Sequence, residues 1–368
     1  MKKLWIYVLF IIGAKPLLAQ DIKWYQPKFI SGICQSDSAD IFHRLPERLK
    51  DSVRNPVWNL SLNTAGEFIH FRTSATTITV RYTLSSPIFE MAHMPSTGVS
   101  GLDLYALDEN GKWNWAPATF HFGDTCSYLF RNLDPAKESG GNSDFYLYLP
   151  LYNSVTWLSI GVNKKDRFVF SERGNKRPVV AYGTSILQGA VASRPGLAWT
   201  NIVERNLRTT VINLGFSGNG QLERPIFDLM AKVNAKLYIL DCMPNLTKDY
   251  GISGDEIKNR IIYGINQLRK RNGKVPILFA EHAVGYVPYY MDTARIHQYH
   301  NGSVLMERIF RELKASGVQN IFLLTDKEIG LDINSTTEGL HPNDIGMMKY
   351  AMAYEKKIRE IFNDAGGN

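Results

Sequence analysis

The chain has 368 residues, 44% of them hydrophobic and 21% charged, and a formal net charge of +7. That length is enough for two domains of ordinary size. No dense run of lysine and arginine interleaves with aromatic residues, so the sequence gives no support for nucleic-acid binding.

Residues 1–19 have the pattern of a secretory signal peptide. Lys2 and Lys3 precede an apolar run over residues 4–14, and the small-residue exit Leu17-Leu18-Ala19 leads into polar sequence. The alternative is a membrane anchor, but the run is too short to span a bilayer of ~30 Å. We therefore predict an exported protein, secreted or periplasmic, without a membrane span. The leader holds three lysines and no acid, so the remainder carries +4.

From residue 20 to about 173 the sequence is typical of β structure. Segments rich in β-branched and aromatic residues occur at 68–71, 77–82, 144–151 and 155–160. The turn Asp108–Lys112 contains Asn110-Gly111, a pair suited to positive φ in a hairpin. Because no long amphipathic helix pattern appears, we predict an all-β sandwich, jelly-roll-like, as an accessory domain. The polar stretch 171–176 would then be the boundary.

From residue 174 to 368 strand-like and helical patterns alternate. Continuous apolar runs, typical of strands buried on both faces, occur at 178–182, 210–214, 236–240, 275–280 and 320–324. This alternation predicts an α/β fold, a three-layer α/β/α sandwich around a parallel five-stranded sheet.

Sequence signals predict the start and the buried face of two helices in this half. Ser253 and Glu256 form a capping box ahead of one apolar stripe, which consists of Ile257, Ile261, Ile265 and Leu268. The last helix is expected to begin near Asn343-Asp344. Its predicted buried residues are Met348, Ala351, Ile358 and Ile361.

Ser185 follows the first strand of the predicted parallel sheet, and ligands of such sheets bind outside the carboxyl ends of the strands. A serine nucleophile needs a base, and His341 is the best candidate. Glu338 lies three residues before His341, with Gly339 between them, so its carboxylate can accept the Nδ1 proton. Pro342 keeps His341 out of the following helix. The alternatives are an ordinary turn serine and a helix-capping loop with a solvated histidine.

A tetrahedral oxyanion requires hydrogen-bond donors. The backbone N–H groups of Ser185 and Gly215 and the side-chain amide of Asn245 each follow a different predicted strand. They are our candidates for an oxyanion hole. For Asn245 the alternative is an Asx turn after Pro244.

Four blocks of this chain together resemble the SGNH (GDSL-type) hydrolase family over residues 177–363. The blocks are Gly183-Thr184-Ser185-Ile186, Asn213-Leu214-Gly215-Phe216-Ser217-Gly218, Asp241-Cys242-Met243-Pro244-Asn245 and Glu338-Gly339-Leu340-His341-Pro342. The resemblance implies a flavodoxin-like fold and ester hydrolysis without a cofactor. It also implies Ser185 as nucleophile, His341 as base, and Gly215 and Asn245 in the oxyanion hole. Thr184 and Glu338 depart from the family, which usually has Asp at both positions.

Two further motifs extend the resemblance. Gly101-Leu102-Asp103-Leu104-Tyr105 and Ser193-Arg194-Pro195-Gly196 are similar to a bacterial subgroup in which a β-sandwich precedes the hydrolase domain. Two-domain carbohydrate acetylesterases have a similar layout, in which the β-domain can contribute to the substrate cleft. For Asp103 and Tyr105 we favour a structural role, a strand start with a hydrogen-bonded corner.

Glu281 and His282 follow the fourth strand of the parallel sheet and are expected at the same edge as Ser185. With Tyr289, whose ring can stack on a sugar, they are candidate substrate-binding residues. The alternative is a packed loop that covers the sheet. His297 and His300 show no metal-ligand spacing, so we predict no metal site.

The resemblance implies an exported serine esterase that removes small acyl groups, acetyl foremost, from carbohydrate or another small ester substrate. One alternative is a lipase or phospholipase. Another is a non-catalytic carbohydrate-binding protein on an inactive hydrolase shell. The sequence leaves the oligomeric state open.

Cys34, Cys126 and Cys242 are expected to be free and mostly buried, with a Cys34–Cys126 disulfide as the alternative.

Overall fold

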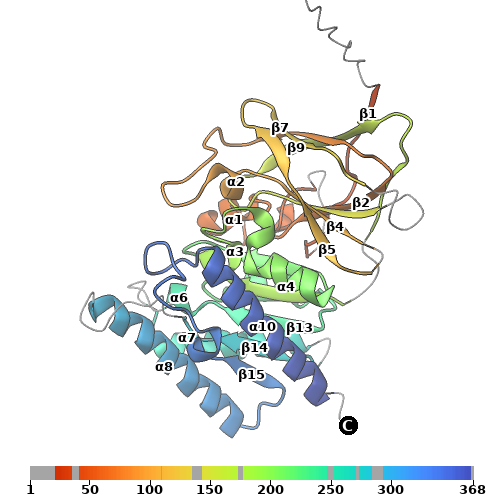
Figure 1. The fold of residues 1–368 in the computed structure, drawn as a ribbon. Coiled ribbons are helices and arrows are strands. Elements are labelled where there is room, and N and C mark those ends of the chain that lie inside the picture. The colour runs from red at the N-terminus through yellow and green to blue at the C-terminus, as the bar shows by residue number, and fades with distance from the viewer. Residues whose placement is uncertain are drawn as a thin grey trace, which may run out of the picture.

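The computed structural model describes residues 21–34, 41–108, 110–134, 143–172, 177–246, 252–270, 273–283 and 293–365. The predicted leader lies outside these residues, as does most of the predicted boundary at 171–176. A β-rich N-terminal half, red to yellow in Figure 1, lies above an α/β C-terminal half coloured green to blue.

Within the described residues, the N-terminal half contains two antiparallel five-stranded sheets. In spatial order, the first is β1 (Ile22–Tyr25), β9 (Val155–Asn163), β3 (Ile78–Leu84), β7 (Cys126–Phe130) and β6 (Ala118–His121). The second is β10 (Phe168–Phe170), β2 (Phe68–Thr73), β8 (Ser143–Tyr148), β4 (Asp103–Leu107) and β5 (Trp113–Ala116). Phe71 and Phe145 of the second sheet share one buried core with Val80 and Phe130 of the first. The two sheets therefore bury their facing sides against each other.

The four strands predicted in this half are confirmed as β2, β3, β8 and β9. The predicted hairpin connects β4 to β5, with a hydrogen bond of 3.0 Å from Asp108 N to Lys112 O and Gly111 at φ +75°. Sequence reasoning missed the short helices between the strands. They are η1 (Glu47–Leu49), α1 (Asn55–Ser61) and α2 (Ser96–Val99).

The C-terminal half is built on a parallel sheet, as predicted. Its described strands, in spatial order, are β12 (Val211–Gly215), β11 (Val179–Gly183), β13 (Leu237–Asp241), β14 (Ile277–Ala280) and β15 (Ile321–Leu324). Every residue of β11 to β14 is buried, because successive side chains enter two different cores. Tyr182 packs in the core on one side of the sheet, and Ala181 packs in the core on the other.

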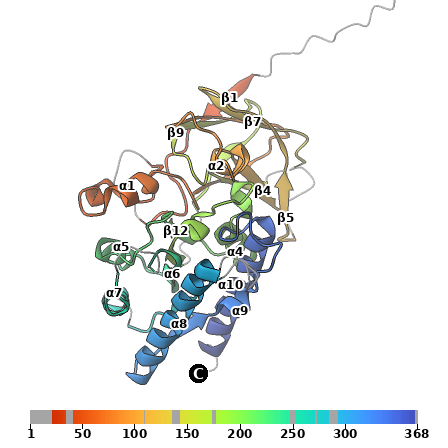
Figure 2. The ribbon, with the colours of Figure 1, turned by 90° about the vertical axis from the view of Figure 1, so that its left-hand side faces the viewer.

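The helices cover the two faces of this sheet separately (Figure 2). One layer contains α5 (Arg224–Met230), α7 (Gly254–Arg269) and α8 (Thr293–Ala315). The opposite layer contains α3 (Ser185–Gln188), η3 (Pro195–Leu197), α4 (Trp199–Leu207) and α10 (Asp344–Ala365). Two further short helices follow strands: α6 (Met243–Leu246) after β13 and α9 (Asp326–Ile329) after β15.

The two helices predicted in detail behave differently. For α7 the burial of the whole apolar stripe is confirmed, but only half of the capping box forms: Ser253 Oγ accepts the Glu256 N–H, whereas the Glu256 carboxylate accepts from Arg260. For α10 the start at Asp344 is confirmed, but the burial of Met348 is wrong, since its side chain is 43% exposed. Met347 is fully buried instead, because the face that packs on α4 carries Tyr354, which stacks on Trp199 at 4.1 Å.

Arg44 joins the two halves at the edge of the parallel sheet. Its buried guanidinium donates to Gly215 O at 2.7 Å and to Asn213 O at 3.3 Å, both on the edge strand β12. It also donates to Asn63 O of the N-terminal half at 2.7 Å. Burial lowers the pKa of Arg44 to about 10, although the buried carboxylate of Glu67 opposes this shift. Because an edge strand presents unpaired carbonyls, Arg44 both satisfies them and docks the N-terminal half there.

The prediction of three free cysteines is confirmed. Cys126 and Cys242 are buried, and Cys34 is partly exposed. Among the described helices, none is both long enough and apolar enough to cross a bilayer.

Candidate active site

Ser185 lies at the carboxyl end of β11, where the chain turns sharply into α3. Thr184 caps this short helix, since its Oγ1 accepts the Ile186 N–H at 3.4 Å. Thr184 thus fills a capping position for which Asp would also be suitable. Ser185 is the first residue of α3 and is 7% exposed, so its hydroxyl is held at the sheet edge.

His341 lies in a loop just before α10. A β-bridge between Thr336 and Pro342 closes this loop, and Gly339 takes a φ of +85° at its bend. The Glu338 side chain turns back across the bend and accepts the backbone N–H of His341 at 3.1 Å. Glu338 and His341 therefore form one compact unit.

The structure brings Ser185, His341 and Glu338 into one hydrogen-bonded chain. Ser185 Oγ lies 2.8 Å from His341 Nε2, although the two residues are 156 positions apart. His341 Nδ1 is hydrogen-bonded to Glu338 Oε1. Partial burial would raise the pKa of Glu338, but its hydrogen bonds to His341 and the charge of that histidine hold it below its usual value. Glu338 is therefore an ionised acceptor near neutral pH.

The side chain of Asn245 is held by a backbone amide. Its buried side chain accepts the Gly220 N–H on Oδ1 at 3.0 Å. Its Nδ2 group makes no hydrogen bond to another described residue, and the same holds for the backbone N–H of Ser185. Gly220 itself packs on the Gly183–Thr184 backbone, directly before Ser185. The Ser185 N–H and Asn245 Nδ2 are therefore donors without a described partner, and Gly220 links Asn245 to the backbone before Ser185.

Gly215 does not fit the donor role expected from the sequence. Its N–H donates to Asn213 Oδ1 at 2.9 Å, and a Cβ at this position would lie 2.3 Å from Gln188 N. Gly215 is thus packed under α3 with its amide already used. Gly218, three residues further on, has a φ of +69° and open space within 4 Å of the position of a Cβ.

Glu281 and His282 are buried, with exposed fractions of 7% and 1%. Glu281 Oε2 accepts the Asp326 N–H at 3.0 Å, at the start of α9, and burial raises the pKa of this carboxyl. His282 packs edge-on against Tyr299 at 4.3 Å. The contacts correspond to the packed-loop alternative, so we do not keep either residue as a substrate contact. Tyr289 lies outside the described residues.

His93 is a residue near the site that sequence reasoning missed. Met91 and Met94 pair through two backbone hydrogen bonds of 2.9 and 3.0 Å, and the exposed His93 lies in the tight turn between them. Its ring centroid is 5.9 Å from that of His341. The N-terminal half therefore contributes to the surroundings of the catalytic loop. A lone histidine in a loop gives no sequence signal for this.

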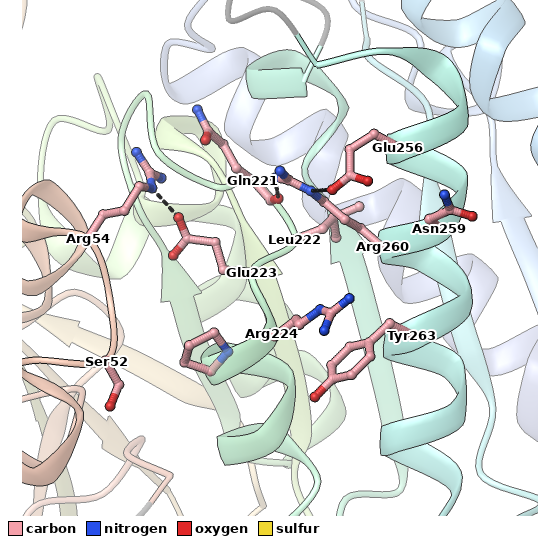
Figure 3. A pocket seen from close by; sticks show the side chains of 11 residues that line it. Ser52, Arg54, Gln221, Leu222, Glu223, Arg224, Glu256, Asn259, Arg260 and Tyr263 are labelled. Atoms are coloured by element: carbon pink, nitrogen blue, oxygen red, sulfur yellow. Dashed lines mark hydrogen bonds and ion pairs between the residues drawn. The ribbon is translucent and has the colours of Figure 1, made fainter.

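A separate pocket of about 390 Å³ lies between α7 and the start of α5 (Figure 3). Arg54 pairs with Glu223 at one side of it, and Arg260 pairs with Glu256 at 2.8 Å. Arg54 also donates to the Asn219 backbone at 3.0 Å, so the N-terminal half holds the loop that carries Gly220. Ser185 and His341 do not line this pocket, and we assign it no ligand.

Within the described parts of the chain, no group of three or more His, Cys, Asp or Glu side chains is arranged to hold a metal ion.

Comparison with known proteins places this site in a family. Residues 176–359, half of the chain, match the GDSL-like lipase/acylhydrolase family, and residues 21–168 match the GxDLY domain, described as the N-terminus of Esterase_SGNH_hydro-type proteins. The chain therefore belongs to the GDSL-like lipase/acylhydrolase family and carries the GxDLY domain ahead of its α/β half. A search of curated proteins finds no match.

Solved structures show a similar fold over most of the chain. A GDSL-like lipase from Bacteroides ovatus, described as putative, is 27% identical with a TM-score of 0.82, covering 93% of this chain and 98% of that chain. The salicylyl-acyltransferase SsfX3 from a tetracycline biosynthetic pathway is 17% identical with a TM-score of 0.72, covering 93% and 98%. A family two carbohydrate esterase from Cellvibrio japonicus is 11% identical with a TM-score of 0.55, covering 81% and 90%.

Asp241 is a buried acid at the end of β13, close in sequence to Asn245. Burial raises the pKa of Asp241 to about 6, although the Tyr354 hydroxyl donates to it at 2.8 Å and opposes the shift. The native state thus retains a proton that the unfolded chain releases near pH 4. The contribution of this bound proton to the free energy of unfolding is complete below that pH. It is lost as the pH rises through about 6.

We predict that Asp241→Asn, which keeps an acceptor for Tyr354, removes this pH dependence. The variant should be more stable than the parent by up to about 3 kcal/mol at pH 8 and by less than about 1 kcal/mol at pH 4. Urea denaturation at both pH values measures the difference. An equal difference at pH 4 and pH 8 would contradict the assignment.

Proposed function

We propose that this protein is an exported serine esterase that removes small acyl groups, acetyl foremost, from carbohydrate. The observation that carries the proposal is the hydrogen-bonded chain from Ser185 Oγ through His341 to Glu338. A hydroxyl, an imidazole and a carboxylate in this order are the parts of a nucleophile, its base and the group that orients the base. Residues 1–19 serve as the signal peptide in this proposal.

In the proposed mechanism Ser185 Oγ attacks the ester carbonyl while His341 Nε2 takes its proton. The protonated imidazole is stabilised by Glu338 and then gives the proton to the departing alkoxide as the ester C–O bond breaks. His341 next takes a proton from water, which attacks the acyl-serine. The acid is released and Ser185 regains its hydrogen.

The oxyanion of each tetrahedral intermediate is assigned to donors beside Ser185. They are the Ser185 N–H and Asn245 Nδ2, whereas the Gly215 N–H already donates to Asn213 Oδ1. Asn245 is preorganised because Gly220 holds its Oδ1 and so directs Nδ2 the other way.

The extra methylene of Glu338 is accommodated by the bend at Gly339. The carboxylate reaches both the Nδ1 atom and the backbone N–H of His341. Two hydrogen bonds to one histidine fix the side chain of Glu338 as well as the imidazole, which offsets the greater freedom of the longer acid.

The carbohydrate substrate is proposed from the structural relatives. One is described as a family two carbohydrate esterase, and another, from Butyrivibrio proteoclasticus, as an acetyl xylan esterase. His93 adds an exposed polar ring beside the imidazole of His341, with the two ring centroids 5.9 Å apart. A sugar leaving group would find a hydrogen-bonding partner there.

Hydrolysis of longer acyl chains is the second candidate, favoured by one observation. Ile345, Met348 and Met352 are exposed by 54%, 43% and 63%, and their spacing places them on one face of α10, just after His341. An apolar surface beside the site suits a lipid-like acyl chain.

The two candidates are separated by a series of p-nitrophenyl esters and an acetylated xylo-oligosaccharide. We expect the acetyl ester to have the highest kcat/KM and acetate to be released from the oligosaccharide. Ser185→Ala, the control, should remove both activities while the fold is retained. An optimum at octanoyl or longer would favour the second candidate, and full activity in Ser185→Ala would reject both.

Substitutions of Glu338 test its role in orienting His341. Glu338→Gln keeps the size of the side chain but offers an amide where Nδ1–H needs an anionic acceptor, so kcat should fall on the order of 10³- to 10⁴-fold. Glu338→Asp keeps the charge and should stay within about tenfold of the parent. Steady-state kinetics of the two folded variants gives the comparison, and equal activities would reduce the site to a Ser185–His341 dyad.

A further inference from the structure

The motif Gly101–Tyr105 buries a carboxylate whose two oxygens are both in use. Asp103 is 3% exposed, and its Oδ1 accepts the Trp115 indole N–H at 2.6 Å. Its Oδ2 accepts from Arg194 Nη1 at 2.6 Å and from the Gly196 N–H at 2.9 Å. A buried carboxylate is costly unless it is paired and hydrogen-bonded. Asp103 therefore holds residues 194–196 of the C-terminal half in one place.

Both motifs need glycine because neighbouring atoms lie too close to leave room for a Cβ. A Cβ at Gly196 would lie 2.3 Å from Tyr105 Cε2 and 2.5 Å from Asp103 Oδ2. A Cβ at Gly101 would lie 2.3 Å from the Thr97 carbonyl oxygen. The motifs 101–105 and 193–196 thus pack closely at Gly196, where a side chain would separate them, whereas a side chain at Gly101 would disturb packing within the N-terminal half.

Ser193, next to Arg194, connects this junction to the start of α10. Its N–H and its Oγ both donate to the Asp344 carboxylate, at 2.9 and 2.6 Å. Its carbonyl accepts from Thr97 Oγ1 of the N-terminal half at 2.6 Å. Asp344 is the first residue of α10 and lies three residues after His341. The loop of His341 is therefore fixed at its exit by Ser193.

We propose that Asp103 is a positioning residue for His341, acting through Arg194, Ser193 and Asp344. The inference rests on the proposed function, because it needs His341 to be the base. It gives the Gly101–Tyr105 motif a function: the N-terminal half sets the position of the catalytic loop. Small displacements are enough to matter, since a misplacement of about 1 Å at a reacting group can cost about 100-fold in rate.

The test compares variants of two residues that link Asp103 to His341 with a control variant at a residue outside this link. Asp103→Asn removes the charge that holds Arg194, and Ser193→Ala removes the hydroxyl that donates to Asp344. Glu204→Gln is the matched control. Glu204 is buried and accepts from Tyr148 of the N-terminal half at 3.1 Å and from Val211 N at 3.2 Å, so these two partners lie outside 193–196 and 341–344.

Each folded variant is assayed on p-nitrophenyl acetate, with its thermal midpoint measured in parallel. We expect Asp103→Asn and Ser193→Ala to lower kcat by about tenfold with KM changed less than about twofold, as for a misplaced base. The double variant should lose no more than the worse single variant, because both act on one path. Ser193→Thr, which keeps the hydroxyl, should restore kcat. Glu204→Gln should lower the thermal midpoint with kcat within about twofold.

Three results would overturn the proposal: an unchanged kcat in Ser193→Ala, multiplicative losses in the double variant, or an equal kcat loss in Glu204→Gln. Ser193→Ala decides the matter if Asp103→Asn does not fold. Labelling of the parent by a fluorophosphonate separates this question from the proposed function. A parent that is neither labelled nor active refutes the esterase assignment, whereas a labelled parent with unaffected variants refutes only the role of Asp103.

Discussion

The buried carboxylate of Asp103 constrains both halves of the molecule. It is enclosed by a tryptophan, an arginine and a backbone amide, and the arginine and the amide come from the α/β half. Burial raises the pKa of Asp103, and the charge and hydrogen bonds of Arg194 oppose that shift, so the α/β half supplies the partners that the buried carboxylate needs. Ser193 and Asp344 connect this docked contact to the loop of His341, so we infer that the docking sets the position of that loop.

A second junction between the halves lies at the edge strand β12 and the loop that follows it. Arg44 satisfies carbonyls of the edge strand β12, and Arg54 holds Asn219 in the loop that follows it. That loop contains Gly220, which orients Asn245. The N-terminal half therefore touches the supports of both the base and the proposed oxyanion hole. An accessory module joined only by a linker would make neither set of contacts.

Local patterns predicted most of the fold and part of the site. The five parallel strands and α7 follow from apolar runs, periodicity and a capping serine, all of which are encoded within a few residues. The Glu338–His341 pair was found because its spacing of three residues across a glycine is also local. Arg44, His93 and the use of the Gly215 amide were missed because each depends on residues distant in sequence or on exact backbone direction. Met348 was misplaced by one position, since helical period alone does not fix which of two adjacent methionines faces α4.

The most direct test of the account is to locate the covalent adduct formed by a fluorophosphonate, using peptide mass spectrometry on the full chain. The account predicts a single adduct, on the peptide that contains Ser185, which forms much more slowly in His341→Ala because the hydroxyl then lacks its base. An adduct on a different serine, or a rate that does not change in His341→Ala, would contradict the central claim.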